Sequence, residues 1–281
     1  TINRYINRYG IDYRFEVAPN PIPELRDRKR DNTTVGSSSS KTISFGTHYG
    51  TALTTSNCSL SSKTDFSVTS INESSVTVKF NPTTAGNKSA TLTITDQHGK
   101  TCKITLNGKT QYAVKYSKGN NGTGNDQTTY KVYGTKLTLA DKGYFTRTGY
   151  TQTAWNTNAA GTGGTSYALK GIYSTDAAIT LYPTWTINQY TVNYGVCESS
   201  RNMGTIQLNS ISAVTTTTSN KYDYGTALNF TAAPTPAEKY EVEGWYSDVA
   251  GNTKIAAASN TYNAGTLSAA TNVYVKFKVR S

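Results

Sequence analysis

The chain has 281 residues, of which 36% are hydrophobic, and it carries a net charge of +11. This length corresponds to about two or three domains, and no stretch approaches the roughly 18 consecutive apolar residues that a membrane span requires. Thr, Ser, Asn and Gly are abundant and good helix formers are scattered, which favours short strands and tight turns. The composition therefore predicts an all-β protein without a membrane span.

Residues 1–40 form a segment with too few apolar residues to fold alone. Three prolines and a mixed charge run fill "APNPIPELRDRKRDN", and "GSSSS" follows as a flexible joint. The segment is either a solvated linker or an irregular arm that orders against other protein subunits. The candidate docking residues of such an arm are the apolar ones of its first part: Ile2, Tyr5, Ile6, Tyr9, Tyr13 and Phe15.

Residues 41–111 show the two-residue alternation of strands. "SVTVKF" alternates Val76, Val78 and Phe80 with polar residues, and "ATLTIT" does the same with Leu92 and Ile94. Short strands at spacings of about 8–12 residues predict a β-sandwich. The skeleton "VTVKFNP…AG…ATLTI…L.G", preceded by "ISFGTHYG", resembles the immunoglobulin-like domains of the abnormal-spindle/hydin type, which implies a spacer or adhesion module.

Residues 112–281 contain a duplication. Its first copy runs through "YGTKLTL", "GYTQTAWNTNAAGTGGTSYAL" and "ITLYPTW", and its second through "YGTALNF", "KYEVEGWYSDVAG" and "TNVYVKF". Trp155 and Trp245 occupy corresponding places, which suits a core position in each copy better than a sugar-stacking platform. Lys239 stands where the first copy has Gly149, and Phe277 where it has Trp185.

The order of these elements closely resembles the Listeria–Bacteroides repeat, also called the internalin B-repeat, at 112–186 and, in a divergent form, at 190–281. The resemblance implies two small β-grasp-like domains, at 112–187 and 188–281, of the kind found in tandem on exported surface proteins. It also implies acidic or host surface glycans as ligands.

The pentapeptide "YGT.L" begins at Tyr49, Tyr133 and Tyr224. Only the last two copies are followed by an aligned Trp, so they belong to the duplication, and the first matches by coincidence. A Tyr, a Gly and a β-branched Thr before a Leu suit a turn that leads into a strand. We expect shared turn chemistry rather than a binding site.

Residues for catalysis are few. His48 and His98 lie in turn-like contexts, and Glu241 and Glu243 are expected on one face of a strand. No nucleophile elbow or protease signature is present, so we expect no enzyme, no catalytic residue and no cofactor. Three Cys at distant positions predict no metal site, and whether Cys58 and Cys102 form a disulfide stays open.

The positive charge is concentrated in the middle of the chain. Residues 41–111 and 112–186 each carry seven Lys or Arg against three Asp or Glu. No motif for reading nucleic acid is present, so the alternatives are solubility and an acidic-ligand patch. The candidates for such a patch all lie in the first repeat: Lys115, Lys118, Lys131, Lys136, Lys142, Arg147 and Lys170.

These features predict a non-enzymatic structural or adhesion protein, displayed on an extracellular assembly and anchored by residues 1–40 in a homo- or hetero-oligomer. A phage virion head or tail decoration or fibre component is slightly favoured, because no leader precedes Thr1 and no sorting segment follows "VYVKFKVRS". The alternatives are a secreted or cell-surface adhesin or spacer of a gut-type bacterium, and a carbohydrate-binding accessory region of a larger enzyme. The expected location is a virion surface or a bacterial cell surface.

Overall fold

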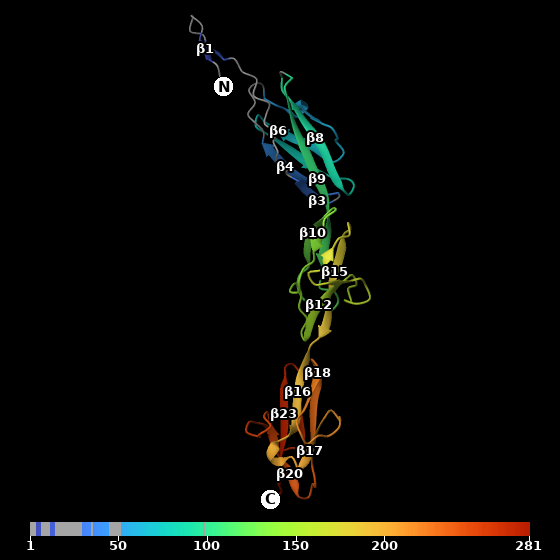
Figure 1. Ribbon diagram of the computed structural model, residues 1–281, viewed down its shortest axis with the longest axis vertical. Helices are drawn as coiled ribbons and strands as arrows, with labels where there is room; N and C mark the ends of the chain where they lie inside the picture. The colour runs from blue at the N-terminus through green and yellow to red at the C-terminus, as the bar shows by residue number, and fades with distance from the viewer. Residues whose placement is uncertain (1–3, 7–11, 15–29, 35, 45–51, 98) are drawn as a thin grey trace. The chain divides into compact units, whose positions relative to one another are not determined.

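The computed structural model describes residues 4–6, 12–14, 30–34, 36–44, 52–97 and 99–281 (Figure 1). These residues form strands, turns and two short 3-10 helices, Thr55–Asn57 and Glu198–Ser200, which confirms the all-β class. Within the ranges just given, no helix is long and apolar enough to cross a membrane. Near the N-terminus, β1 (Arg4–Ile6) pairs with β2 (Asp12–Arg14) in an antiparallel hairpin.

Two sheets form the first module, which we call the sandwich. Its strands are β3 (Arg30–Thr34), β4 (Ser39–Ser44), β5 (Cys58–Leu60), β6 (Phe66–Ile71), β7 (Ser75–Phe80), β8 (Asn87–Thr95) and β9 (Thr101–Tyr116). One sheet has the order β4-β7-β6, and in the other β5, β8 and β9 are neighbours and β3 pairs with β9 in parallel. The alternating residues Val76, Val78 and Phe80 are buried with Leu92 and Ile94, as the sequence pattern predicts.

The strand register separates Cys58 from Cys102. Both residues are opposite Ile94 of β8, Cys58 on one side and Cys102 on the other. Two strand spacings place their Cα atoms about 10 Å apart, beyond the roughly 7 Å limit for a disulfide. Both are free thiols, and burial raises the pKa of each.

The chain divides into two compact units, and the division runs through the first repeat. The first unit consists of Thr1–Tyr116, Asp126–Ala140 and Lys170–Leu181, and the second of Ser117–Asn125, Asp141–Leu169 and Tyr182–Ser281.

The first repeat contributes strands to both units. They are β10 (Gln127–Val132), β11 (Leu137–Thr138), β12 (Tyr150–Asn156), β13 (Ser166–Ala168), β14 (Ile172–Tyr173) and β15 (Ile179–Ile187). In the first unit, β10 pairs with β9 in antiparallel fashion, and residues 179–181 of β15 pair with β9 in parallel. In the second unit, the rest of β15 pairs with β12, and β12 pairs with β13.

The second repeat is built from two sheets over one core. Its strands are β16 (Gln189–Val196), β17 (Gly204–Leu208), β18 (Thr218–Asp223), β19 (Ala227–Pro234), β20 (Tyr240–Tyr246), β21 (Lys254–Ala256), β22 (Thr261–Thr266) and β23 (Thr271–Val279). The sheets have the orders β18-β16-β23-β20-β21 and β17-β19-β22. The parallel pairing of β16 with β23 fits the predicted β-grasp likeness, but three strands rather than a helix cover this sheet.

The paired tryptophans lie in the interior, as predicted. Trp155 and Trp245 are both 0% exposed. Phe145 packs edge-on against Trp155, while Phe230 and Tyr262 pack against Trp245. Trp185, by contrast, is half-buried, although its counterpart Phe277 is 2% exposed.

Candidate functional site, the joints between modules

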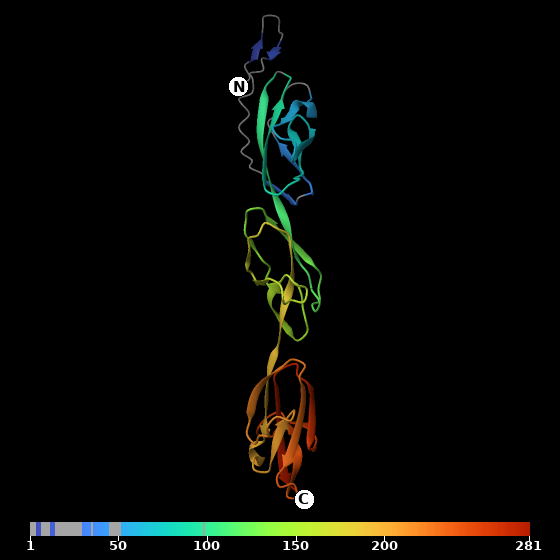
Figure 2. The same cartoon turned by 90° about the vertical axis from the view of Figure 1, so that its right-hand side faces the viewer.

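Consecutive modules are joined without a linker. The single strand β9 runs through the predicted boundary between residues 111 and 112 (Figure 1, Figure 2). Its first part pairs with β8, and with β3 over residues 107–111. Its last part pairs with β10 over residues 111–116 and with β15 over residues 114–116. A single residue, Asn188, separates β15 from β16.

The first joint is centred on Thr110. Its N–H donates to the carbonyl of Gly86 at 3.1 Å, and its carbonyl accepts the N–H of Tyr133 at 2.8 Å. The Thr110 hydroxyl oxygen accepts the N–H of Gly86 at 2.9 Å. Thr110 is 0% exposed, and these bonds satisfy the polar groups that its burial would otherwise leave unpaired. They tie a sandwich loop, the joint residue and the first repeat together.

The second joint is centred on Asn188. Its N–H donates to the carbonyl of Gly149 at 2.9 Å, and its carbonyl accepts the N–H of Tyr224 at 2.8 Å. The hydroxyl of Thr151 donates to the side-chain oxygen of Asn188 at 2.7 Å. Gly149 has a φ of +77°, and a Cβ at this position would overlap the ring of Tyr224. Glycine is therefore required both for its conformation and for the close approach of the ring.

Both joints have the same plan. In each joint, the carbonyl of a glycine with positive φ, Gly86 or Gly149, accepts the N–H of the joint residue. The carbonyl of the joint residue in turn accepts the backbone N–H of the Tyr of "YGT". The predicted turn is confirmed in both repeats, since Thr135 donates its N–H to Val132 and Thr226 to Asp223. The motif thus closes a turn and also binds the joint residue, a role that sequence reasoning missed. The remaining copy of "YGT", at Tyr49, lies outside the described residues.

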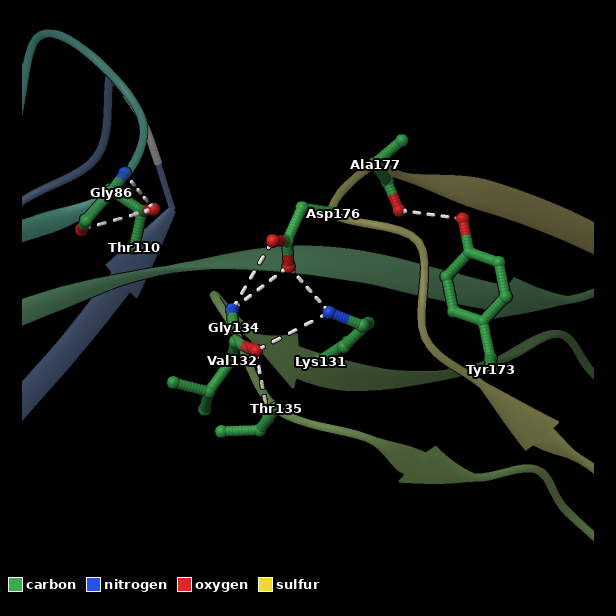
Figure 3. A network of polar contacts seen from close by, with 9 residues as sticks. All are labelled: Gly86, Thr110, Lys131, Val132, Gly134, Thr135, Tyr173, Asp176 and Ala177. Carbon is green, nitrogen blue, oxygen red and sulfur yellow. Dashed lines mark hydrogen bonds and ion pairs between the residues drawn. The ribbon is translucent and has the colours of Figure 1, made fainter.

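An ion pair lies close to the first joint (Figure 3). Lys131 on β10 is completely buried, and its ammonium is 2.5 Å from Oδ1 of Asp176, whose side chain is 33% exposed. Asp176 also accepts the N–H of Gly134, the glycine of "YGT", at 3.0 Å. The hydroxyl of Tyr173 donates to the carbonyl of Ala177 at 3.0 Å and holds the loop that carries Asp176. These contacts connect the "YGT" turn to the segment that precedes β15.

These bonds also fix the charge on Asp176. The hydrogen bond from Lys131, followed by that from the backbone of Gly134, lowers the pKa of Asp176 below its usual 3.8. The carboxylate therefore stays ionised at neutral pH and compensates the buried ammonium, which would be costly without a partner.

The second repeat lacks this ion pair. Tyr222 holds the place of Lys131, because each lies opposite the first tyrosine of its repeat, Tyr190 or Tyr112. Ser268 holds the place of Asp176, three residues before the strand that enters the parallel ladder. The repeat fold itself therefore does not require the pair.

The structure removes Lys131 from the predicted acidic-ligand patch. Lys131 points inward on β10, and its charge is matched by Asp176. Arg147 is half-buried, and its guanidinium is 3.5 Å from the centre of the Tyr150 ring. The remaining five are exposed and divide between the two units: Lys115, Lys136 and Lys170 in the first, Lys118 and Lys142 in the second. Acidic-ligand binding by these residues stays a prediction.

Of the other predicted site residues, Tyr5, Ile6 and Tyr13 lie on the paired strands β1 and β2. Ile2, Tyr9, Phe15, His48 and His98 lie outside the described residues. Docking by residues 1–40 stays a prediction.

Glu241 and Glu243 alternate with the buried Val242 on β20. Each pairs with a lysine of β23, Glu241 with Lys278 at 3.1 Å and Glu243 with Lys276 at 3.2 Å. The two carboxylates are bound in cross-strand ion pairs, as is typical of a solvated sheet face.

The comparisons with known proteins support the duplication. The family model of the Listeria-Bacteroides repeat domain matches residues 112–183 and 205–270, whereas no curated protein matches the chain. The likeness of residues 41–111 to immunoglobulin-like domains stays a prediction. Domains of the repeat family are typically extracellular or surface-associated. The joints at Thr110 and Asn188 thus connect a sandwich to two tandem modules that match the Listeria-Bacteroides repeat domain.

Proposed function

We propose that the chain is a non-enzymatic spacer and display protein of an extracellular surface, held there through residues 1–40. The observation that carries this proposal is the repeated joint. Two successive boundaries use the same backbone bonds, at Thr110 and at Asn188, with no linker between the modules. A series of directly joined modules suits a protein that holds its far end away from its anchor.

The polar groups of the described modules support a structural role. Lys131 and Asp176 neutralise each other, and the Glu–Lys pairs of the second repeat join neighbouring strands. Among the described residues, no group of three or more His, Cys, Asp or Glu is arranged to hold a metal. The paired polar groups named here act in packing and in strand pairing.

Surface labelling tests the proposal. Antibodies raised against the second repeat should label the intact source before lysis, and external protease should remove the signal. Labelling only after lysis would refute display. Gold labelling of cells and of purified phage particles from the same culture separates the two settings predicted from the sequence.

The role of the arm is tested separately. A chain shortened to residues 30–281, which keeps β3 and β4 of the sandwich, should fold but be released into the medium if the segment before β3 anchors it. Retention of the shortened chain on the surface would refute anchoring by the arm and leave surface display intact.

A further inference from the structure

In every module, the strand by which the chain enters is a direct neighbour of the strand by which it leaves, and the two are parallel. In the sandwich, β3 pairs with β9 from Arg30 opposite Asn107 to Thr34 opposite Gln111. In the first repeat, β9 pairs with β15 over Val114–Tyr116. In the second repeat, β16 pairs with β23 from Val192 opposite Thr271 to Val196 opposite Val275.

This topology determines how tension acts on the ladders. When the ends of a chain are pulled apart, two parallel terminal strands slide past each other, so that all hydrogen bonds between them are strained together. Antiparallel terminal strands have their free ends on the same side, so their bonds break one after another. Parallel terminal ladders therefore resist tension through the joint action of all their bonds.

We propose that the chain is a tension-bearing tether, in which each module is held by a parallel terminal ladder and the weakest ladder is reinforced by the Lys131–Asp176 ion pair. The biological use of this property rests on the proposed function, since a displayed spacer is pulled when its far end binds. The mechanical property itself is independent of that setting.

The lengths of the ladders explain why only the first repeat has the ion pair. Its parallel ladder has three register pairs, whereas those of the sandwich and the second repeat have five each. The first repeat, which has the short ladder, contains the buried ion pair. The second repeat, which has a longer ladder, has Tyr222 and Ser268 at the positions that correspond to Lys131 and Asp176.

The ion pair lies where it opposes the sliding movement. Asp176 precedes the start of β15 by three residues, and Lys131 lies on β10 opposite Tyr112 of β9. Six register pairs hold β10 to β9, so these two strands should move together. Under tension β15 is drawn forward past β9, and the bonds from Lys131 and Gly134 to Asp176 resist this displacement.

Single-molecule pulling of the full chain by its two ends tests the tether. The chain between Tyr112 and Ile187 is shorter than that between Gln189 and Val279, so the extension released identifies which repeat unfolds. We expect three high-force events, one from the sandwich and one from each repeat. Attachment at Gln189 and Asp223, which are opposite each other on antiparallel β16 and β18, should open the second repeat at about half the force or less, because its bonds break in turn. Equal forces in the two geometries would overturn the proposal.

Variants of the ion pair test the reinforcement. Asp176→Ser should lower the force at which the first repeat unfolds and leave the unfolding force of the second repeat unchanged. The exposed Asp126, just before β10, supplies the matched control Asp126→Ser. The double variant Lys131→Met/Asp176→Ser removes both charges. It therefore avoids the misfolding that an unpaired buried ammonium could cause in Asp176→Ser. This double variant should still lose force, and a wild-type force in it would overturn the reinforcement.

The two proposals fail separately. Surface labelling together with equal forces in the two pulling geometries would refute the tether and keep display. High forces without surface labelling would refute display and keep the mechanical property.

Discussion

At the scale of single residues, β10 reverses the usual order of apolar and polar positions. Lys131 is completely buried, whereas its neighbour Tyr130 is 49% exposed. The partner that makes this arrangement stable, Asp176, is 45 residues further along the chain. A lysine in an alternating strand is expected on the solvated face. The sequence pattern therefore predicts that Lys131 is exposed, whereas in the structure it forms a buried ion pair with Asp176. Burial of an ammonium is tolerated because a carboxylate and backbone groups surround it.

The first prediction concerns the stability of the fold at low pH. The folded state lowers the pKa of Asp176, so its contribution to stability is present above the unfolded value of 3.8 and is lost as the pH falls through the folded value. Urea unfolding between neutral pH and about pH 3 should therefore show a smaller acid-induced loss in Lys131→Met/Asp176→Ser than in the wild type. Asp248, whose pKa is lowered by backbone N–H groups of Asn252 and Thr253, supplies an acid-sensitive contribution common to both proteins. Identical pH profiles would contradict the role of the ion pair.

The second prediction concerns Cys197. Burial, followed by the nearby charge of Asp248, raises the pKa of this thiol from 9.0 to about 11. Because the thiolate is the reactive form, Cys197 of the folded protein should be alkylated far more slowly than in denaturant at about pH 8.5. Mass spectrometry of the alkylated peptides gives the rate, with the half-buried Cys58 and Cys102 as internal references.

The same shift predicts an alkaline loss of stability. A raised folded pKa means that the contribution of the neutral thiol is complete below pH 9.0 and is lost as the pH rises toward about 11. Cys197→Ala should lack this part of the loss. Rapid alkylation of the native protein would show that Cys197 is not held in the interior.

At the scale of elements, the glycine of the second joint gives a direct test of its geometry. Gly149→Ala should lower the free energy of unfolding by more than the roughly 1–2 kcal/mol that a left-handed residue costs, because the new Cβ would also overlap the ring of Tyr224. Gly163→Ala is the matched control, since Gly163 has a similar φ of +80° but its Cβ would have open space, with the nearest atom 3.8 Å away. Equal losses in the two variants, measured by chemical denaturation, would contradict the packing of Tyr224 on Gly149.

Much of the element structure is predictable from the sequence. Alternation indicates the strands of the sandwich, the repeated tryptophans indicate the two cores, and "YGT" indicates a turn. The joints are not predictable in this way, because each combines residues distant in the chain, such as Gly86, Thr110 and Tyr133. Backbone bonds of this kind leave no mark on side-chain pattern beyond the glycines themselves. The burial of Lys131 is not predictable for the same reason, since its partner Asp176 belongs to a distant segment of the chain.

At the scale of the whole molecule, the chain is a series of modules whose boundaries fall inside continuous structure. The first joint belongs to the first compact unit and the second joint to the second unit. Each boundary is therefore packed as part of a unit. A domain series with flexible linkers would instead have exposed, polar segments at these places. Joints without a linker are consistent with the proposed role as a spacer.

Hydrogen exchange at the joints is the most direct test of this account. The backbone N–H groups of Tyr133 and Tyr224 are bound to the carbonyls of Thr110 and Asn188. They should exchange as slowly as amides in the strands of their own repeats, because their release requires the joint to open. Exchange of both groups at the rate of an exposed loop would show that the modules are not joined as described and would contradict the account.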